Sequence, residues 1–138
     1  MKYNKPPKNP RLGEPYYMER DIHGNKLSYV IYDKDENNQT VPVEYKYEYD
    51  SNDRKTAFYK SDGEFSLYEY DKYGDITYKV NGNVRTGITT EHWYSGSKET
   101  FRRRVDAETM QVREHRNNVQ TAEYYNPFVR VYSNPLCR

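Results

Sequence analysis

The sequence predicts an all-β fold: an antiparallel meander of tyrosine-rich hairpins that forms an open twisted sheet or a small barrel. Tyrosine accounts for 17 of the 138 residues, so the aromatic fraction reaches 16% although the hydrophobic fraction is only 34% and the mean hydropathy is -1.28. Short runs of β-forming residues alternate with turn signals at roughly 8 to 12 residues, the spacing typical of all-β domains. Because a tyrosine ring can pack while its hydroxyl reaches water, we expect a thin core made largely of tyrosine.

The chain begins with a proline-rich stretch. Residues 1–15 hold four of the seven prolines, which predicts a flexible arm and leaves residues 16–138 as a single antiparallel β domain. This stretch lacks the apolar segment of a signal peptide, and no apolar run approaches the roughly 20 residues that span a bilayer. We therefore expect a soluble protein with no membrane contact. It would be cytoplasmic, or exported without a classical signal peptide as part of a larger assembly, in a bacterial or phage context.

Several strands and turns can be placed in order along the middle of the chain. In residues 45–49, tyrosines alternate with charged residues, which predicts a strand with three rings on one face. A turn is expected at residues 50–53, and Ser61-Asp62-Gly63 predicts a hairpin. Residues 65–70 form the next expected strand, and Asn81-Gly82 is expected to close a later hairpin because both residues tolerate positive φ.

The segment 98–125 contains neither glycine nor proline, so a helix is open to it by propensity. A strand pattern also fits, with a hairpin over residues 99–115 that turns at residues 106–109. For residues 117–125 a short C-terminal helix is the competing expectation. The fold prediction is therefore all-β, or β with one short C-terminal helix.

A repeat underlies the meander. Tyr47-Glu48-Tyr49-Asp50 recurs 21 positions later as Tyr68-Glu69-Tyr70-Asp71. We expect each aspartate to cap a turn with its side chain. The residue three positions later, Asp53 or Gly74, is then expected to take the unusual backbone angle.

This pattern resembles the YD (Tyr-Asp) repeat of the RHS family, the β-strand shells of bacterial toxin carriers and related cell-surface proteins. The resemblance covers residues 45–136 and is most specific over residues 45–82. Residues 101–109 and 126–136 are similar to the end of an RHS core. The chain contains no Asp-Pro pair, so the autoproteolysis of that family is not implied. It is also too short to encapsulate cargo, so the resemblance implies a short, degenerate, fragment-like relative.

Candidate catalytic residues are few. The chain has three histidines, and His92 and His115 are the candidates for a metal-independent nuclease, with one as base, the other as acid and a nearby arginine holding phosphate. The alternative is two surface histidines, because no spacing forces them together. No cofactor or metal site is expected, since Cys137 is the single cysteine and the histidines are scattered. We read residues 33–37 as a solvated acidic turn.

Tyrosine and arginine dominate the candidate binding residues, because they offer large rigid area and fork-shaped donors. If residues 102–104 form a strand, the first and third arginines share one face and Arg103 lies on the other. The alternative is that these arginines pair with acidic neighbours between Glu99 and Glu114. The candidate binding residues are Tyr45, Tyr47, Tyr49, Tyr68, Tyr70, Trp93, Arg102, Arg104, Arg113 and Arg116.

The leading functional expectation is a non-enzymatic binding or interaction module that engages a protein or glycan partner through tyrosine- and arginine-rich sheet faces. The first alternative is a nucleic-acid-binding protein that uses aromatic stacking and the basic stretch 102–116. The second alternative is a small toxin nuclease that uses His92 and His115. Open sheet edges would also allow a homodimer or a donor-strand partner.

Overall fold

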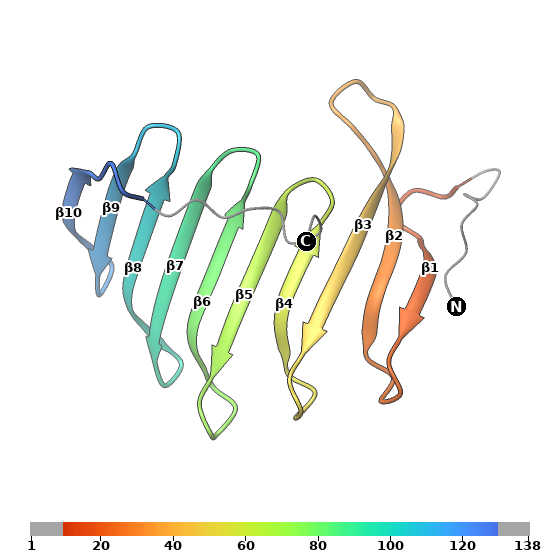
Figure 1. The fold of residues 1–138 in the computed structure, drawn as a ribbon, viewed down its shortest axis with the longest axis horizontal. Coiled ribbons are helices and arrows are strands. Elements are labelled where there is room, and N and C mark those ends of the chain that lie inside the picture. Colours follow the sequence, from red (N-terminus) through yellow and green to blue (C-terminus); the bar gives the residue numbers. More distant parts are fainter. Residues whose placement is uncertain (1–9, 130–138) are drawn as a thin grey trace. The chain divides into compact units, whose positions relative to one another are not determined.

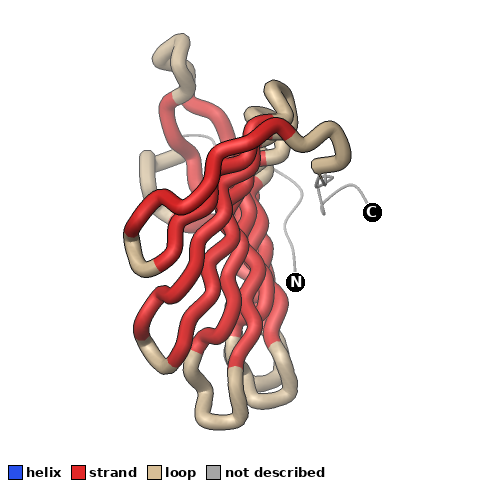
Figure 2. The backbone as a smooth tube through the Cα atoms, turned by 90° about the vertical axis from the view of Figure 1, so that its left-hand side faces the viewer, coloured by secondary structure: helices blue, strands red, loops and turns tan. Residues whose placement is uncertain are grey.

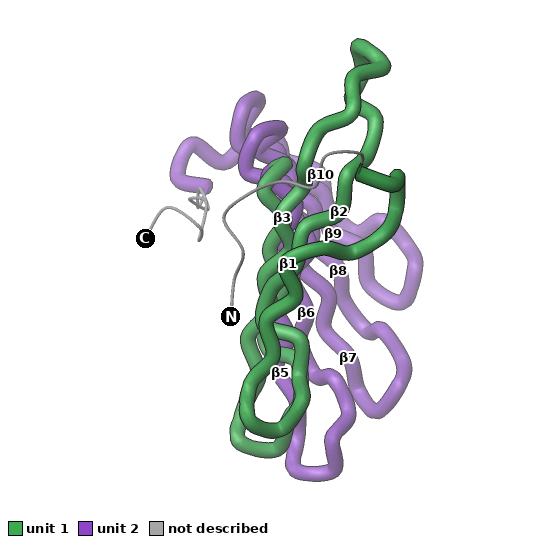
Figure 3. Tube along the Cα trace, turned by 90° about the vertical axis from the view of Figure 1, so that its right-hand side faces the viewer, with its two compact units in different colours: residues 1–62 green, residues 63–138 purple. Residues whose placement is uncertain are grey.

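A computed structural model describes residues 10–129, which contain ten β-strands and no helix (Figure 1). Within residues 1–62 and within residues 63–138, consecutive strands pair antiparallel, and in the described chain the first and last strands of each stretch do not pair with each other. The predicted all-β meander is thereby confirmed. The described residues hold no helix that is long and apolar enough to cross a membrane. The chain divides into two compact units, residues 1–62 (unit 1) and residues 63–138 (unit 2), which are coloured separately in Figure 3.

Unit 1 contains a four-stranded meander. Its strands are β1 (Pro15–Arg20), β2 (Lys26–Lys34), β3 (Thr40–Tyr49) and β4 (Lys55–Lys60). The three predicted rings of residues 45–49 lie on one face of β3, and the opposite face carries the buried side chains. These buried side chains are Val30, Tyr32, Ala57 and Tyr59, each at most 8% exposed. Residues 1–9 of the predicted arm lie outside the described residues.

Unit 2 contains a six-stranded meander, and Figure 2 shows strands and loops without a helix in the described chain. Its strands are β5 (Glu64–Tyr70), β6 (Ile76–Asn83), β7 (Ile88–Ser95), β8 (Lys98–Asp106), β9 (Gln111–Arg116) and β10 (Val119–Tyr125). Its most deeply buried side chains are Val80 and Val112, each 1% exposed, and Phe65, which is 2% exposed. The core is thin, as a single sheet layer with few aliphatic residues requires.

One turn design recurs in four hairpins. An aspartate accepts hydrogen bonds through one carboxylate oxygen from the backbone N–H groups two and four positions later, at 2.9–3.0 Å. The residue three positions later has a positive φ of 60–89°. The turns begin at Asp21, Asp35, Asp50 and Asp71, and the positive-φ residues are Gly24, Asn38, Asp53 and Gly74. The roles predicted for Asp50 and Asp71 are confirmed.

Two sequence predictions about turns and helices are wrong. Residues 117–125 form a hairpin turn and strand β10, not a helix: Asn117 and Asn118 both have positive φ, at 50° and 66°. The helix propensity of this segment is outweighed by a two-residue turn whose backbone matches the twist of the flanking strands. Asn81-Gly82 is not a turn either, because both residues pair with β7 inside β6, and the chain reverses later, around Gly87 with φ of 74°. The hairpin predicted over residues 99–115 is confirmed as β8 and β9.

Close packing around position 82 in β6 leaves no room for a side chain, so the residue there is glycine. A Cβ atom at this position would lie 2.8 Å from the Cε1 and Cζ atoms of the Phe65 ring and 3.1 Å from the Thr89 hydroxyl oxygen. Phe65 sits directly opposite Gly82 in the β5–β6 register and is almost fully buried. The ring therefore has little room to move away from an added methyl group.

We predict that Gly82→Ala destabilises the protein by about 1–3 kcal/mol, the usual cost of overpacking a tight site. Urea unfolding should show a lower midpoint with an unchanged slope. Phe65→Leu in the Gly82→Ala background should recover part of the loss, because it removes the ring atoms that the methyl group meets. A Gly82→Ala variant as stable as the wild type would contradict this packing.

Candidate binding surfaces

Five aromatic side chains of unit 1 form a continuous layer on one face of β2, β3 and β4, which we call the tyrosine surface. Its members are Tyr29, Tyr45, Tyr47, Tyr49 and Phe58. Tyr29 and Tyr45 are direct cross-strand partners whose rings stack at 4.9 Å with an interplanar angle of 11°. The Tyr47 ring lies 5.3 Å from the Phe58 ring, which faces it from β4. All five side chains remain partly exposed.

Three of the four hydroxyl groups of this surface are ordered by hydrogen bonds. The Tyr29 and Tyr47 hydroxyls are 2.7 Å apart, and the Tyr49 hydroxyl donates to the Lys26 carbonyl at 2.8 Å. Burial, with the hydrogen bond to Tyr29 second, raises the pKa of Tyr47 well above the ordinary phenol value. Burial also raises the pKa of Tyr49. These phenols therefore stay neutral at physiological pH and keep a proton to donate.

Lysine side chains border the tyrosine surface. The Nζ atoms of Lys26, Lys55 and Lys60 lie 5.8, 4.8 and 5.4 Å from the ring centroids of Tyr29, Tyr47 and Tyr45, respectively. These distances are within the range of cation–π attraction. The surface thus combines aromatic rings at its centre with hydroxyl and ammonium donors at its edge.

A second surface lies on one face of unit 2, and the strand register defines it. His92 in β7 is opposite Arg102 in β8, which is opposite His115 in β9. A parallel row two residues along these strands contains Arg104 and Arg113. With Lys79, the partner of His92 on β6, these side chains form what we call the basic face: Lys79, His92, Arg102, Arg104, Arg113 and His115.

Acidic residues neutralise only part of the basic face. Glu99 lies 2.7 Å from His92 Nδ1 and 3.7 Å from Arg102, and Glu123 lies 3.3 Å from Arg113. Arg104 is exposed, and within residues 10–129 it has no ion pair. The expected pairing of the arginines with acidic neighbours therefore holds for Arg102, whereas Arg104 departs from it.

The two candidate catalytic histidines are brought into one row, with Arg102 between them. His92 Nδ1 is held by Glu99, whereas His115 Nδ1 is buried and has no hydrogen-bond partner among the described residues. The register thus supplies the proximity that the spacing of the two histidines in the sequence does not. The nuclease stays a prediction.

Two of the predicted binding residues, Trp93 and Arg116, lie on the opposite face of unit 2, apart from the others. Trp93 lies between the rings of Tyr78 and Phe101, at 5.1 and 5.2 Å. Arg116 lies over Phe101 at 4.9 Å and so does not join Arg102 and Arg104. The four arginines named as candidate binding residues therefore do not share one face, because Arg116 is separated from Arg102, Arg104 and Arg113. Arg116 is displaced because it pairs opposite Phe101 in the β8–β9 register.

Arg103 is fully matched on that opposite face. It lies 3.6 Å from Glu91 and 3.3 Å from Glu114, and the Tyr124 hydroxyl donates to Glu114 at 2.7 Å. A groove of about 350 Å³ runs beside this ladder, with Val105 and Val112 among its lining residues. Charged side chains, Glu91 and Arg103, line the groove together with these valines, so its wall is mixed polar and apolar.

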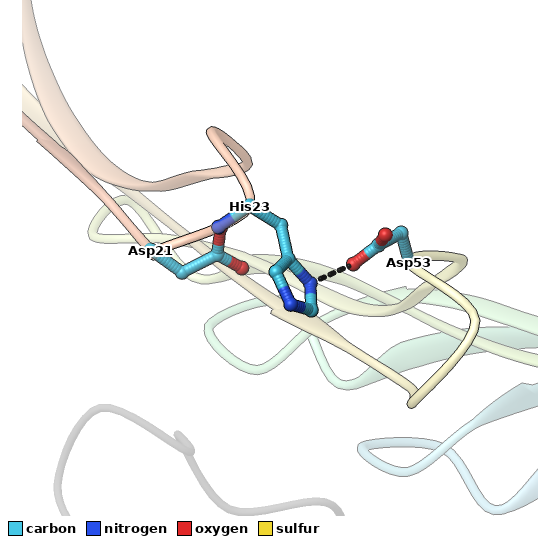
Figure 4. Close-up of side chains that lie close together, drawn as sticks. All are labelled: Asp21, His23 and Asp53. Atoms are coloured by element: carbon cyan, nitrogen blue, oxygen red, sulfur yellow. Dashed lines mark hydrogen bonds and ion pairs between the residues drawn. The ribbon is translucent and has the colours of Figure 1, made fainter.

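A third cluster joins two turns of unit 1 at the same end of the strands (Figure 1). Figure 4 shows His23 from the β1–β2 turn reaching Asp53 in the β3–β4 turn, with 2.7 Å between His23 Nδ1 and a carboxylate oxygen. Asp21 lies beside them, and the Asn25 side-chain amide donates to both carboxylates. Ligand atoms of the two aspartates and the histidine lie within 4.8 Å of one another, a spacing suited to a metal ion. Each of the three side chains already has a hydrogen-bond partner, and the contact between His23 and Asp53 joins the two turns. We call the cluster of Asp21, His23 and Asp53 the clasp.

We predict that the clasp is proton-linked. The hydrogen bond to Asp53, and then its charge, raise the pKa of His23 above the ordinary imidazole value. Because the folded-state pKa is the higher one, the contact stabilises fully just below the ordinary imidazole value and is lost as pH rises through the raised value. An NMR titration should show that Asp53→Asn lowers the pKa of His23.

The matched control for this titration is Asp33→Asn, which removes one carboxylate at the other end of β2 and should leave the His23 titration unchanged. Asparagine also tolerates the positive φ of 61° at position 53, so the turn should survive the Asp53→Asn change. Identical His23 titrations in the wild type and Asp53→Asn would show that the clasp does not form.

Sequence reasoning missed several members of these surfaces. Tyr29 and Phe58 complete the tyrosine surface, and Lys79 extends the basic face. The alternation of residues along each strand shows which side chains share a face of that strand. It places them on a common surface only when the register with the neighbouring strands is known. Tyr68 faces Lys79 across β5 and β6 and so lies on the basic face. Cys137 lies outside the described residues.

No family model, curated protein or solved structure matches this chain.

Proposed function

We propose that this protein is a non-enzymatic binding module that holds a glycan on the tyrosine surface of unit 1. One observation supports it above others: five partly exposed rings are packed side by side and bordered by three lysines. A pyranose ring offers an apolar C–H surface and a rim of hydroxyl groups. Aromatic rings with hydroxyl and ammonium donors at their edges complement both parts.

A glycan suits this surface better than a protein does. Protein hot spots are usually desolvated pockets that take an apolar anchor. Here the centre of the surface is amphipathic, since each tyrosine ring carries a hydroxyl. The Tyr45 hydroxyl has no hydrogen bond to another described residue, so it is free to donate to a sugar oxygen. The rings also stack on each other, so their side chains are already ordered and lose less conformational entropy when a ligand binds.

The same features favour binding over catalysis at this surface. Its titratable groups are phenols and ammonium groups, and burial raises the pKa of Tyr47 further from neutrality. General acid–base catalysis works best with a group whose pKa lies near the working pH. Oligosaccharides held on this surface are therefore expected to remain intact.

The proposal can be tested with an array of neutral and acidic oligosaccharides, followed by calorimetry on the best ligand. We predict that Tyr45→Ala weakens binding roughly tenfold, as expected when an aromatic contact is lost. Tyr45→Phe keeps the ring and should lose less. The matched control is Tyr73→Ala, since Tyr73 is 78% exposed in a turn outside the surface.

Thermal unfolding, monitored by circular dichroism, should show that the variants remain folded. An array on which no glycan is retained would refute the proposal. So would a folded Tyr45→Ala variant with wild-type affinity.

We also propose that the Tyr-Asp hairpins are related to RHS repeats. What supports this is that Asp50 and Asp71, which end the two motif copies, cap their turns with the same hydrogen bonds. Asp35 builds the same turn without a preceding Tyr-x-Tyr, however, so the turn by itself is not diagnostic of the family. Residues 130–136 of the resembling segment lie outside the described residues.

A further inference from the structure

We propose that the basic face of unit 2 is a second binding site, separate from the tyrosine surface, that takes single-stranded nucleic acid. Its first support is the register, which places basic side chains from four adjacent strands, β6 to β9, on one side of the sheet. Neighbouring strands lie about 4.8 Å apart, and rows of side chains on one face repeat about every 6.8 Å along a strand. The basic side chains therefore form a compact two-row array.

The second support is the charge arrangement within the array. Arg104 and Arg113 are direct cross-strand partners, and like charges in that position destabilise a sheet. Arg113 has Glu123 at 3.3 Å, whereas Arg104 has no ion pair among residues 10–129. The Asp106 carboxylate, at the end of the same strand, accepts the backbone N–H groups of Glu108 and Thr109 instead. A phosphate between the two guanidinium groups would replace repulsion with bidentate hydrogen bonds.

The row containing Arg102 adds further donors. His92 and His115 flank Arg102, and Lys79 follows on β6. Lys79 forms no ion pair with another described residue, so its ammonium group is also available. The buried Nδ1 of His115 has no partner in the described chain. One acidic side chain, Glu99, serves this row, and it is shared between His92 and Arg102.

Aromatic rings on the same face favour a single strand over a duplex. Tyr68 lies opposite Lys79, and the Tyr94 ring stacks on His92 with ring centres 6.3 Å apart and planes 21° apart. Unpaired bases stack on aromatic side chains while cations follow the phosphates. In a duplex the base faces are covered by their neighbours, so the rings would have nothing to stack on. The combination of rings and unmatched cations points to a single strand.

The opposite face of unit 2 supplies an internal comparison. There Arg103 is matched by Glu91 on one side and Glu114 on the other. Two adjacent arginines of β8 therefore differ in their surroundings. Arg103 is neutralised on one face, whereas Arg104 on the other face is not. The unmatched charge is a property of the basic face and does not follow from arginine content alone.

The test is fluorescence anisotropy of the full chain with an end-labelled oligothymidylate, measured over a series of salt concentrations. Binding should weaken as salt rises, and the logarithmic slope reports the number of phosphates contacted, at about 0.7 for each. We predict that the double variant Arg104→Ala/Arg113→Ala weakens affinity roughly tenfold and lowers the slope by about 1.4. Tyr94→Ala should weaken binding with little change of slope.

The matched control is Arg116→Ala, which removes one arginine charge from the opposite face and should leave both affinity and slope unchanged. Absence of binding at low salt would overturn the proposal, as would a double variant that binds like the wild type. Retention of a sulfated polysaccharide without retention of the oligonucleotide would also overturn it. Tyr45→Ala tests glycan binding in unit 1 and should not affect this assay, so either proposal can fail alone.

Discussion

The hydrogen bonds that turn aspartates accept from backbone N–H groups are the constraint on which the rest of the structure depends. Asp50 shows how strong the constraint is: the backbone N–H of Arg54, with further hydrogen bonds, lowers the pKa of this carboxyl below its ordinary value. These bonds fix where four of the hairpins reverse, and hence the register of the strand that follows each of them. A slip of one residue would exchange the two faces of a strand. The tyrosine surface therefore depends on the turns at Asp35 and Asp50, and the place of Lys79 on the basic face depends on the turn at Asp71.

The β8 strand illustrates what the register decides. Arg102, Arg103 and Arg104 are identical in chemistry, and composition gives no reason to treat them differently. Alternation sends Arg103 to a ladder between two glutamates and leaves Arg104 beside Arg113 on the other face. The electrostatic character of each face thus follows from position along the strand. A protein with a net charge of only +1 can in this way carry a locally cationic surface.

Local features were predictable because their physics is local. The alternation of residues 45–49 and the capping roles of Asp50 and Asp71 depend on residues within one hairpin, and they were predicted correctly. Asn81-Gly82 was misassigned because the reason for a glycine there is the Phe65 ring, 17 positions earlier in the chain. The contact between His23 and Asp53 and the proximity of His92 to His115 could not be derived, for the same reason: each depends on a register that no short sequence pattern reveals.

The tyrosine surface also explains how so polar a chain can fold. Stacked rings such as Tyr29 and Tyr45 cover each other's faces, so they contribute apolar burial without a second layer of structure. That arrangement leaves ring edges and hydroxyls at the surface. The groups that stabilise the sheet and the groups that a ligand can reach are then different parts of the same side chains. Stability and recognition can be changed separately at such a position, because losing a hydroxyl leaves the stacked ring intact, whereas losing the ring removes both.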